Sequence, residues 1–300
     1  MANIEKRLPT NVPGEFYVDS TCIDCGTCRE LAPETFAAGA DQSFVHHQPE
    51  GPEAVRRATR ALLACPTASI GTVTPDPDAA RAAMGDFPLP LTEDVSFLGF
   101  TSPRSFGAAS YWVRRAEGSW LIDSPRYHPA LFTRIAAEGG LAHVFLTHRD
   151  DVADAARYAA HFKAARWIHA ADAEAMPDAE HHVAVTEPIE LAPGCLAIPT
   201  PGHTAGSWVL LVDDRYLFTG DHLWGAFPPG HAPSDGAGRF LEASRTACWY
   251  DWETQIRSME RLLDYRFEWV LPGHGHTLHL PAEAMRAELE ALIARMKAKA

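Results

Sequence analysis

No stretch of this 300-residue chain approaches the ~20 consecutive apolar residues that a helix needs to cross a bilayer. The opening residues, MANIEKRLPTNVPGEF, lack the apolar segment of a secretory signal. Positive charge is scarce: 26 Lys and Arg stand against 39 Asp and Glu, the formal net charge is −13, and no basic stripe is present. These absences argue against a membrane protein and against nucleic acid as a partner. We expect a soluble cytoplasmic protein.

Internal repeats and low-complexity segments are also absent, and the chain divides by composition instead. Apolar residues make up 46% of it, which is enough for one sizeable core and a small additional domain. Residues 73–92 are rich in Pro, Asp and Ala and have no sustained periodicity, so they are predicted to form a linker. This linker separates a small domain at residues 12–72 from a larger domain at residues 93–300.

Four of the six cysteines lie in the small domain. Such clustering without a secretory signal favours metal ligation over a disulfide framework. Cys22, Cys25 and Cys28 are three residues apart, a spacing that lets one tight loop hold three corners of an iron–sulfur cube. Cys65, which is followed by a proline, is the candidate for the fourth corner. Zinc is the alternative, because CxxC pairs also form zinc sites.

The run CIDCGTCRELAP resembles the bacterial ferredoxin pattern C-x2-C-x2-C-x3-C-P, whose last cysteine serves a second cluster. In this chain Ala32 stands at that last cysteine, while Pro33 is retained. The resemblance implies a small ferredoxin-like α+β domain that holds one 4Fe-4S cluster and has lost the second.

Beyond residue 92 strands and helices alternate, and His or Asp residues follow several apolar strands. His148 follows HVFLT, His203 follows CLAIPTPG, Asp221 closes YLFTGD, and His274 follows EWVLPG. Imidazoles and a carboxylate placed by rigid elements, with a position open to water, are what divalent metal catalysis requires. We therefore predict that these residues converge on a metal site. Helices are predicted for PALFTRIAAEG, for DVADAARYAAHF, and around residues 246–265 and 281–298.

The chain contains, in this order, TH ending at residue 148, PGHTAGS, FTGD and PGHG. This series resembles the motifs of metallo-β-lactamase-fold hydrolases, particularly the glyoxalase-II-like branch. The resemblance implies an αββα sandwich, so that the whole chain is of the α+β class. It also implies that His148 and His203 hold a first metal, that His274 holds a second, and that a catalytic Asp221 bridges them. Asp123 would support the site from behind the ligands.

The resemblance breaks down at the first motif, which in the family reads H-x-H-x-D-H. Without a gap, Asp150 replaces the second histidine, and Val152 and Ala153 replace the final Asp-His pair. We prefer an alignment with a two-residue insertion, because it retains a carboxylate at the start of the helix.

In the gapped alignment Asp150 or Asp151 replaces the second histidine, Asp154 is the aspartate, and Ala155 replaces the last histidine. Asp150 and Asp154 then become metal ligands, and Asp154 joins Asp221 as a catalytic residue. The alternative is that Asp150 and Asp151 only cap the following helix.

These departures have consequences for the metal. A carboxylate in place of an imidazole makes the ligand set harder, which favours iron or manganese over zinc. The loss of a histidine weakens the second position, so one or two divalent ions are expected. His148, His203 and Asp221 alone would form the two-His, one-carboxylate set of non-haem iron chemistry.

The Gly- and Pro-rich connection between residues 222 and 250 is long enough to cover a site. Its aromatic residues are candidates for an apolar wall, and its arginines for binding an anionic group, although ordinary surface packing would also explain them. The residues are Trp224, Phe227, Trp249, Tyr250, Arg239 and Arg245.

Three functions remain open. The first is a metal-dependent hydrolase in which metal-bound hydroxide attacks a thioester, lactone or related ester. The second is a non-haem iron oxidoreductase or dioxygenase that receives electrons from the ferredoxin domain. The third is an electron carrier or redox sensor without catalysis. The expected partners are a small-molecule substrate and, for the redox functions, an electron-transfer partner. Hydrolysis is placed first because it is the commoner activity of the family.

Overall fold

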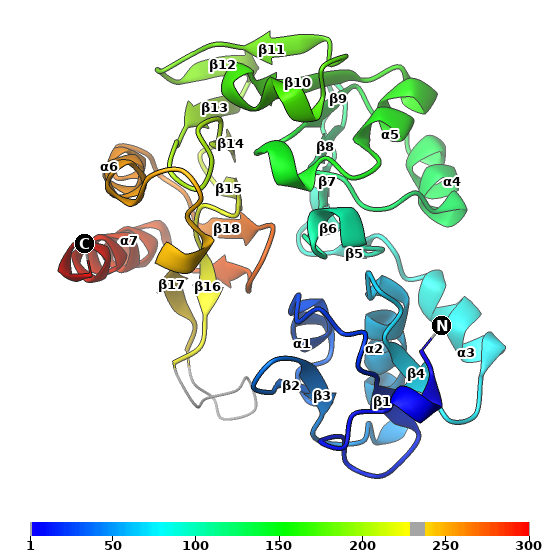
Figure 1. Ribbon diagram of the computed structural model, residues 1–300. Helices are drawn as coiled ribbons and strands as arrows, with labels where there is room; N and C mark the ends of the chain where they lie inside the picture. The colour runs from blue at the N-terminus through cyan, green and yellow to red at the C-terminus, as the bar shows by residue number, and fades with distance from the viewer. Residues whose placement is uncertain (1, 229–237, 300) are drawn as a thin grey trace.

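The computed structural model describes residues 2–228 and 238–299. A small N-terminal part, drawn in blue in Figure 1, packs against a larger part built from two sheets. The α+β class and the αββα sandwich predicted for the larger part are both confirmed by the arrangement of the elements.

Short strands and two helices form the small part around the four clustered cysteines. Helix α2 buries Ala58 and Ala61 completely. Asn11 lies just before the predicted domain boundary, and its side-chain oxygen accepts hydrogen bonds from Val18 N and Val45 N. The elements are β1 (Phe16–Val18), α1 (Thr27–Leu31), β2 (Phe36–Ala38), β3 (Ser43–Val45), α2 (Gly51–Ala64) and β4 (Ile70–Thr72).

The segment predicted as a linker is largely ordered. It contains helix α3 (Pro77–Met84), which Asp76 caps, and strand β5 (Leu89–Pro90), which pairs with β6 in the first sheet. Asp86 ties the segment to α2 through Arg60 Nε at 2.6 Å. A helix of only two turns leaves no sustained periodicity, which explains why composition alone indicated a linker.

The first sheet of the sandwich has seven strands in the order β11-β10-β9-β8-β7-β6-β5. Strands β7 and β8 are an antiparallel pair, and β8 through β11 run parallel. The strands after β5 are β6 (Val95–Phe97), β7 (Tyr111–Val113), β8 (Trp120–Ile122), β9 (His143–Phe145), β10 (Ala165–His169) and β11 (His181–Val183).

The second sheet has six strands in the order β12-β13-β14-β15-β18-β19, and β15 and β18 are parallel. Every residue of β14 and β15 is buried, as expected for strands that are covered on both faces. The strands are β12 (Ile189–Ala192), β13 (Cys195–Pro199), β14 (Trp208–Val212), β15 (Tyr216–Gly220), β18 (Trp269–Pro272) and β19 (Leu278–His279). A separate ribbon pairs β16 (Trp224–Ala226) with β17 (Phe240–Glu242).

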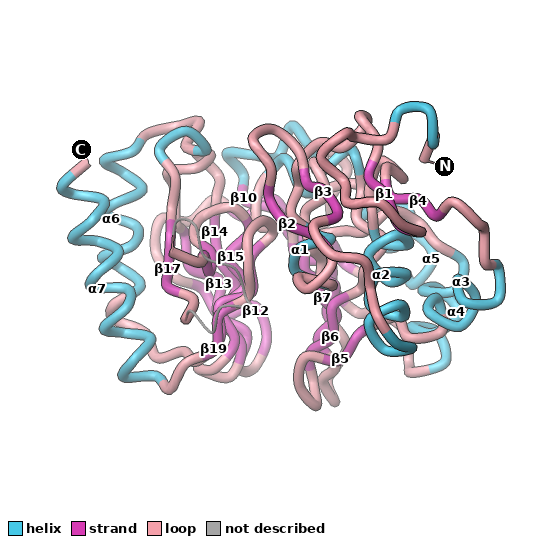
Figure 2. Tube along the Cα trace, turned by 90° about the horizontal axis from the view of Figure 1, so that it is seen from below, coloured by secondary structure: helices cyan, strands magenta, loops and turns pink. Residues whose placement is uncertain are grey.

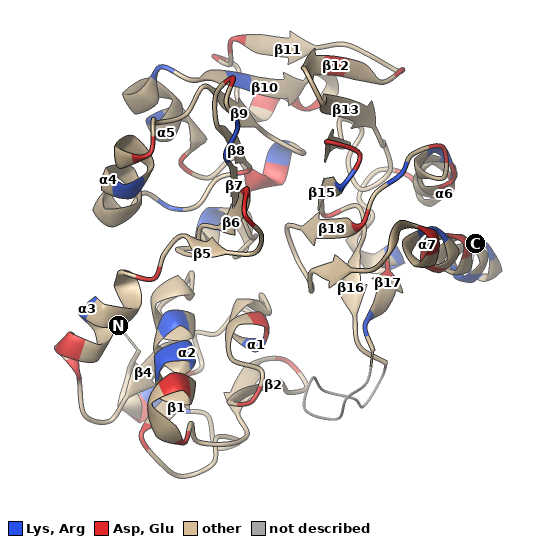
Figure 3. Ribbon diagram, turned by 180° about the vertical axis from the view of Figure 1, so that it is seen from behind, with Lys and Arg blue, Asp and Glu red and all other residues tan. Residues whose placement is uncertain are grey.

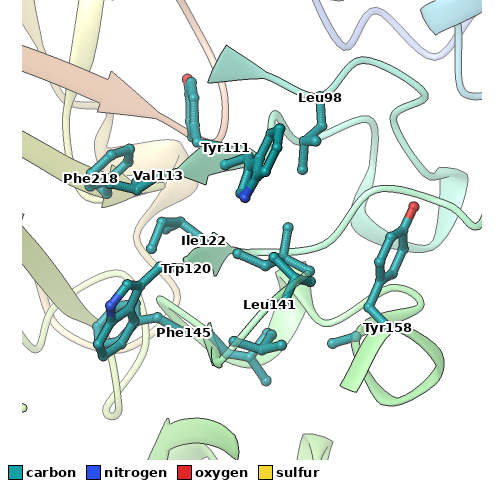
Figure 4. Packing of buried hydrophobic residues seen from close by; sticks show 14 of the residues in the cluster. Leu98, Tyr111, Val113, Trp120, Ile122, Leu141, Phe145, Tyr158 and Phe218 are labelled. Carbon is teal, nitrogen blue, oxygen red and sulfur yellow. The ribbon is translucent and has the colours of Figure 1, made fainter. Parts of the chain in front are cut away.

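Helices cover the outer faces of the two sheets, as Figure 2 shows. The covering helices are α4 (Pro129–Ala137) and α5 (Ala155–Phe162) beside the first sheet, and α6 (Trp252–Leu262) and α7 (Ala282–Ala298) beside the second. Between the sheets, Tyr111 packs against Phe218 with ring centroids 5.5 Å apart, and Phe145 stacks on Trp208 at 4.6 Å. Figure 4 shows part of this core, which fixes the relative position of the strand ends that carry the site.

Acidic and basic residues are interspersed along helices α2 and α7, as the colours of Figure 3 show. Among the helices of the described residues, none combines the length and the apolar composition that a membrane-spanning segment requires.

Candidate metal centre

The four predicted strand-end residues come together at one edge of the sandwich. His203 follows β13, Asp221 follows β15, and His274 follows β18, three strands that run in the same direction within the second sheet. His148 follows β9 of the facing sheet. Gly220 has a φ of +49°, and a side chain there would collide with Thr147, so this glycine lets the Asp221 loop lie against the His148 loop.

Four ligand atoms surround a first position, which we call site A (His148, Asp150, His203, Asp221). Asp221 Oδ2 lies 3.9 Å from His148 Nε2 and 3.8 Å from His203 Nε2. Asp150 Oδ2 lies 3.8 Å from each of the same two nitrogens. Atoms about 2.1 Å from a tetrahedral ion are about 3.4 Å apart, so a small contraction would let these four residues share one metal.

A second group, which we call site B (Asp151, Asp221, His274), adjoins the first through Asp221. His274 Nδ1 lies 2.7 Å from Asp221 Oδ1. A Cβ on Gly273 would lie 2.7 Å from Asp151 Oδ2 and 2.8 Å from Asp221 Oδ1, so only glycine leaves room for both carboxylates. Asp221 therefore faces both sites, as the resemblance implied for a bridging ligand.

Several donor atoms of the two sites have no hydrogen-bond partner in the protein, as expected for atoms that bind a metal. Within the described residues, His148 Nε2, His203 Nε2 and both carboxylate oxygens of Asp151 are buried and have no hydrogen-bond partner. Leaving a buried polar atom unpaired costs about 1–3 kcal/mol. Four such atoms aimed at adjoining positions fit divalent ions at sites A and B.

Hydrogen bonds behind the ligands fix the orientation of both site A imidazoles. His203 Nδ1 donates to the carbonyl of Ala247, which leaves Nε2 free as a ligand. His148 Nδ1 lies 3.1 Å from the hydroxyl of Thr147, which in turn donates to Asp123 Oδ2 at 2.9 Å. Asp123 thus acts through Thr147 in the supporting position implied by the family resemblance.

Burial and the crowding of carboxylates shift the pKa of several of these groups. Burial raises the pKa of Asp123 to about 8 and that of Asp151 well above its usual range, and the charge of Asp221 adds to both shifts. Burial alone would also raise the pKa of Asp221, but His274, His148 and His203 hold it well below its usual range. Burial lowers the pKa of His148 to about 4, which keeps the imidazole in its neutral, metal-binding form. A bound cation would offset the carboxylate crowding.

The structure does not bring Asp154 to either site. Its Oδ1 pairs with Arg104 at 3.1 Å, and its Oδ2 accepts a hydrogen bond from Tyr127 N at 2.7 Å. Asp150 and Asp151 instead lie in a 3₁₀ turn (Arg149–Asp151), and α5 starts only at Ala155. The position of Asp150 beside His148 and His203 agrees with its place as the substitute for the second histidine, which both alignments allow. The gapped alignment is wrong for Asp154, which it alone makes a metal ligand.

The four predicted cluster cysteines converge in the small part. Cys22, Cys25, Cys28 and Cys65 line one apolar cavity together with residues such as Val18. No disulfide joins cysteines within the described residues. Burial raises the pKa of Cys28 to about 12, so a bound metal ion is needed to hold this thiol as a thiolate at neutral pH. Ser69 N donates to Cys65 Sγ at 3.3 Å, a contact of the kind that tunes cluster potentials.

The cluster-binding loop and the metal centre share one open cleft of about 830 Å³. Its lining includes Cys25 of the cluster, and Asp150, His203, Asp221 and His274 of sites A and B. Nothing in the sequence signalled this juxtaposition, because the two motifs lie far apart along the chain.

A half-buried carboxylate connects the two parts beside this cleft. Glu30 lies on α1, two residues after Cys28, and accepts hydrogen bonds from His276 Nδ1 and, at 2.9 Å, from Thr277 Oγ1. Glu30 Oε2 also forms an ion pair with Arg239 Nη2 at 3.0 Å.

The aromatic residues and arginines of the 222–250 connection, proposed to line the site, do not all lie in the cleft. Trp224 and Trp249 line the cleft, whereas Phe227 packs against His276 with ring centroids 5.0 Å apart. Arg239 is occupied by Glu30, and Arg245 donates to the carbonyl of Lys299 at 3.0 Å, so both arginines are engaged within the chain. Residues 229–237 of this connection lie outside the described residues.

Separate substitutions of Asp150 and Asp151 are expected to deplete different metals. Asp150→Asn should weaken the ion at site A and leave site B loaded, and Asp151→Asn should do the reverse. Mutating a residue that only hydrogen-bonds to a metal ligand lowers metal affinity about 10–100-fold. Removing the charge of the ligand itself should lower the affinity at least as much. Elemental analysis after dialysis against increasing chelator measures both affinities. Equal metal release from the two variants would contradict the division into two sites.

Comparison with known proteins agrees with these two parts. Residues 18–72 match the family described as the 4Fe-4S single cluster domain of Ferredoxin I. The hydroxyacylglutathione hydrolase of Acidiphilium cryptum (strain JF-5) is 33% identical over 156 residues, which cover 50% of this chain and 60% of that protein. The match thus spans less than two thirds of the relative.

A solved metallo-β-lactamase of low sequence identity shares the architecture of the larger part. The metallo-β-lactamase DIM-1 is 14% identical, with a TM-score of 0.50 over 69% of this chain and 95% of that chain. The chemotaxis sensor ODP, solved as a peroxy diiron species, is 19% identical, with a TM-score of 0.48 over 68% and 93% of the two chains. The chain therefore joins a single-cluster 4Fe-4S ferredoxin domain to a domain of the metallo-β-lactamase fold.

Proposed function

We propose that this protein is a non-haem iron oxidoreductase whose ferredoxin domain supplies electrons to the metal centre for the oxidation or reduction of a small molecule. One observation carries the proposal: cluster ligand Cys25 lines the same cleft as the residues of sites A and B. A regulatory or purely structural cluster would not need to open onto the metal centre. Hydrolysis, which the sequence placed first, requires nothing from this arrangement.

The ligand set supports the same function. Sites A and B together contain three carboxylates, from Asp150, Asp151 and Asp221, against three imidazoles. Oxygen-rich sets of this kind suit iron and manganese better than zinc. Iron bound there would supply one-electron chemistry and activation of dioxygen.

The side chains of the chain have separate tasks in this function. The imidazoles of His148 and His203 are oriented as metal ligands by Thr147 and by the carbonyl of Ala247. Asp221 stays ionised between the two sites because three imidazoles surround it. Trp249 lies beside His203, with ring centroids 6.0 Å apart, and gives the cleft an apolar side.

Hydrolysis of an acyl thioester is the second candidate. It is favoured by the similarity to a hydroxyacylglutathione hydrolase over half of this chain. A metal-bound water with its pKa lowered toward about 7 would be the nucleophile. In that case either zinc or manganese should support the reaction, since no change of oxidation state is needed.

Metal exchange with the cluster intact separates the two functions. Protein with a chemically reduced cluster is loaded with iron or with zinc, then mixed with dioxygen, and cluster reoxidation and oxygen uptake are recorded. The proposal expects both to be markedly faster with iron. The opposing result is hydrolysis of an acylglutathione thioester by zinc- and iron-loaded protein alike, retained in Cys65→Ser, with no acceleration of oxygen uptake by iron.

A further inference from the structure

A single peptide unit lies between the cluster loop and the metal loop. The residues are Phe106 and Gly107, which follow a 3₁₀ turn (Pro103–Ser105) of the larger domain. Both have left-handed backbone conformations, with φ values of +49° and +87°. For a phenylalanine this conformation costs about 1–3 kcal/mol and persists only where its surroundings impose it.

On the cluster side, Gly107 is in contact with Cys25. A Cβ on Gly107 would lie 2.6 Å from Cys25 Cβ, 2.8 Å from Cys25 Sγ and 3.1 Å from Pro66 Cγ. No side chain fits in that space, so glycine is required for the backbone to approach the cluster ligand. Thr27 Oγ1 donates to the Gly107 carbonyl at 3.2 Å and lies 3.4 Å from Cys25 Sγ, which holds the two together.

On the metal side, the Phe106 carbonyl accepts a hydrogen bond from His274 Nε2 at 3.3 Å. The opposite nitrogen of the same ring, Nδ1, faces Asp221 in site B. The path from Cys25 to His274 thus has three parts. They are a van der Waals contact from Cys25 to Gly107, the covalent bonds of the Phe106–Gly107 peptide, and the hydrogen bond from His274 to the Phe106 carbonyl. The site A imidazoles have other partners: His148 contacts Thr147, and His203 donates to Ala247.

We propose that the Phe106–Gly107 peptide carries the electron from Cys25 to His274, so that electrons enter the metal centre at site B. The inference rests on the redox function proposed above. In the step, one electron leaves the reduced cluster, which returns to its oxidised state, and one ferric ion becomes ferrous. An external low-potential one-electron donor, such as a reduced flavoprotein or dithionite, then reduces the cluster again. No bond or proton is exchanged at the peptide, and Gly107 and Thr27 act as positioning residues.

Gly107→Ala tests the route, with Gly51→Ala as the matched control. Both glycines have a left-handed φ, +87° and +80°, but a Cβ on Gly51 meets nothing within 4 Å. The control therefore carries the backbone strain without displacing Cys25. Each variant is purified anaerobically, loaded with ferric iron or with zinc, and its cluster is reduced by a light flash with a deazaflavin. The rate at which cluster absorbance returns is then measured.

The wild-type protein and Gly51→Ala should show fast cluster reoxidation that depends on iron. Gly107→Ala should keep its cluster and its metal but reoxidise the cluster slower by an order of magnitude or more. Thr27→Val, which removes the hydrogen bond to Gly107 without adding bulk, should slow it several-fold. The magnetic interaction between the reduced cluster and Mn²⁺ at the second centre, seen by EPR, should weaken in parallel.

A wild-type rate in Gly107→Ala with intact cofactors would overturn the route. Should that variant lose its cluster, Thr27→Val decides, and an unchanged rate there overturns the route as well. Failure of the proposed function looks different: wild-type protein would then reoxidise its cluster equally fast with iron and with zinc.

Discussion

Asp221→Asn is expected to strip metal from both sites and to abolish activity. Asp221 is the residue common to the two groups, with Oδ2 facing His148 and His203 and Oδ1 facing His274. An amide keeps the volume of the side chain but loses the negative charge that the three imidazoles stabilise. Mutating a residue that hydrogen-bonds to a metal ligand lowers metal affinity about 10–100-fold. Removing a ligand that both sites share should lower the affinity more. Metal content per chain, measured after gel filtration, should fall to near zero, while the visible spectrum of the cluster should persist.

Asp154→Asn is the matched control for this substitution. The gapped sequence alignment makes Asp154 a ligand, whereas the structure pairs it with Arg104 and Tyr127. Metal content equal to wild type is therefore expected, with at most a small loss of stability. A joint loss of metal in both variants would mean that the loop after His148 is arranged differently when metal is bound.

The strand-end ligands were predictable because each follows a recognisable apolar strand. Parallel directions within one sheet then brought His203, Asp221 and His274 to the same edge. The loop after His148 was less predictable, because a 3₁₀ turn points neighbouring side chains in different directions. Asp150 therefore reaches site A and Asp151 reaches site B, a division that no alignment to a linear motif expresses.

The contact between the two domains could not be predicted from the sequence. Glu30 and His276 are 246 residues apart. Glu30 occupies a variable position of the ferredoxin pattern, and His276 directly follows the PGHG motif, so neither pattern indicates a contact. Gly107 also lacks a signal, since an isolated glycine in a loop indicates only a turn. These residues matter because the backbones of the two domains come close together where they lie. Hydrophobic periodicity indicates helices and strands, but it does not indicate which loops of two domains meet.

Glu30→Ala is expected to loosen the ferredoxin domain from the metal domain by about 1–3 kcal/mol, the cost of leaving hydrogen-bonded polar groups without their partner. The larger cost of breaking a fully buried ion pair does not apply, because 28% of the Glu30 side chain and 24% of the Arg239 side chain stay exposed. Removing the carboxylate leaves Arg239 and His276 without their partner at the interface. Urea unfolding followed by cluster absorbance measures the loss, and the cluster should also become more accessible to chelators.

The stabilisation by Glu30 should depend on pH in one direction. Burial alone would raise the pKa of Glu30, but the hydrogen bond from His276 and the charge of Arg239 hold it below its ordinary value of 4.5. Because the folded pKa is the lower one, the contribution is complete above pH 4.5 and is lost as the pH falls through the folded pKa. Glu30→Gln keeps the shape of the side chain and should lose this pH dependence.

Glu34→Ala provides the control for Glu30→Ala, because it removes a carboxylate of the same domain from a more exposed pair. Glu34 lies 2.7 Å from Arg57 Nε, with 32% and 39% of the two side chains exposed. Such surface pairs contribute about 0–1 kcal/mol. We therefore expect Glu30→Ala to lower the free energy of unfolding clearly more than Glu34→Ala does. If Glu30→Ala costs no more than Glu34→Ala, Glu30 does not hold the cluster domain against the metal centre, and the contact that brings Cys25 to His274 must be maintained by other residues.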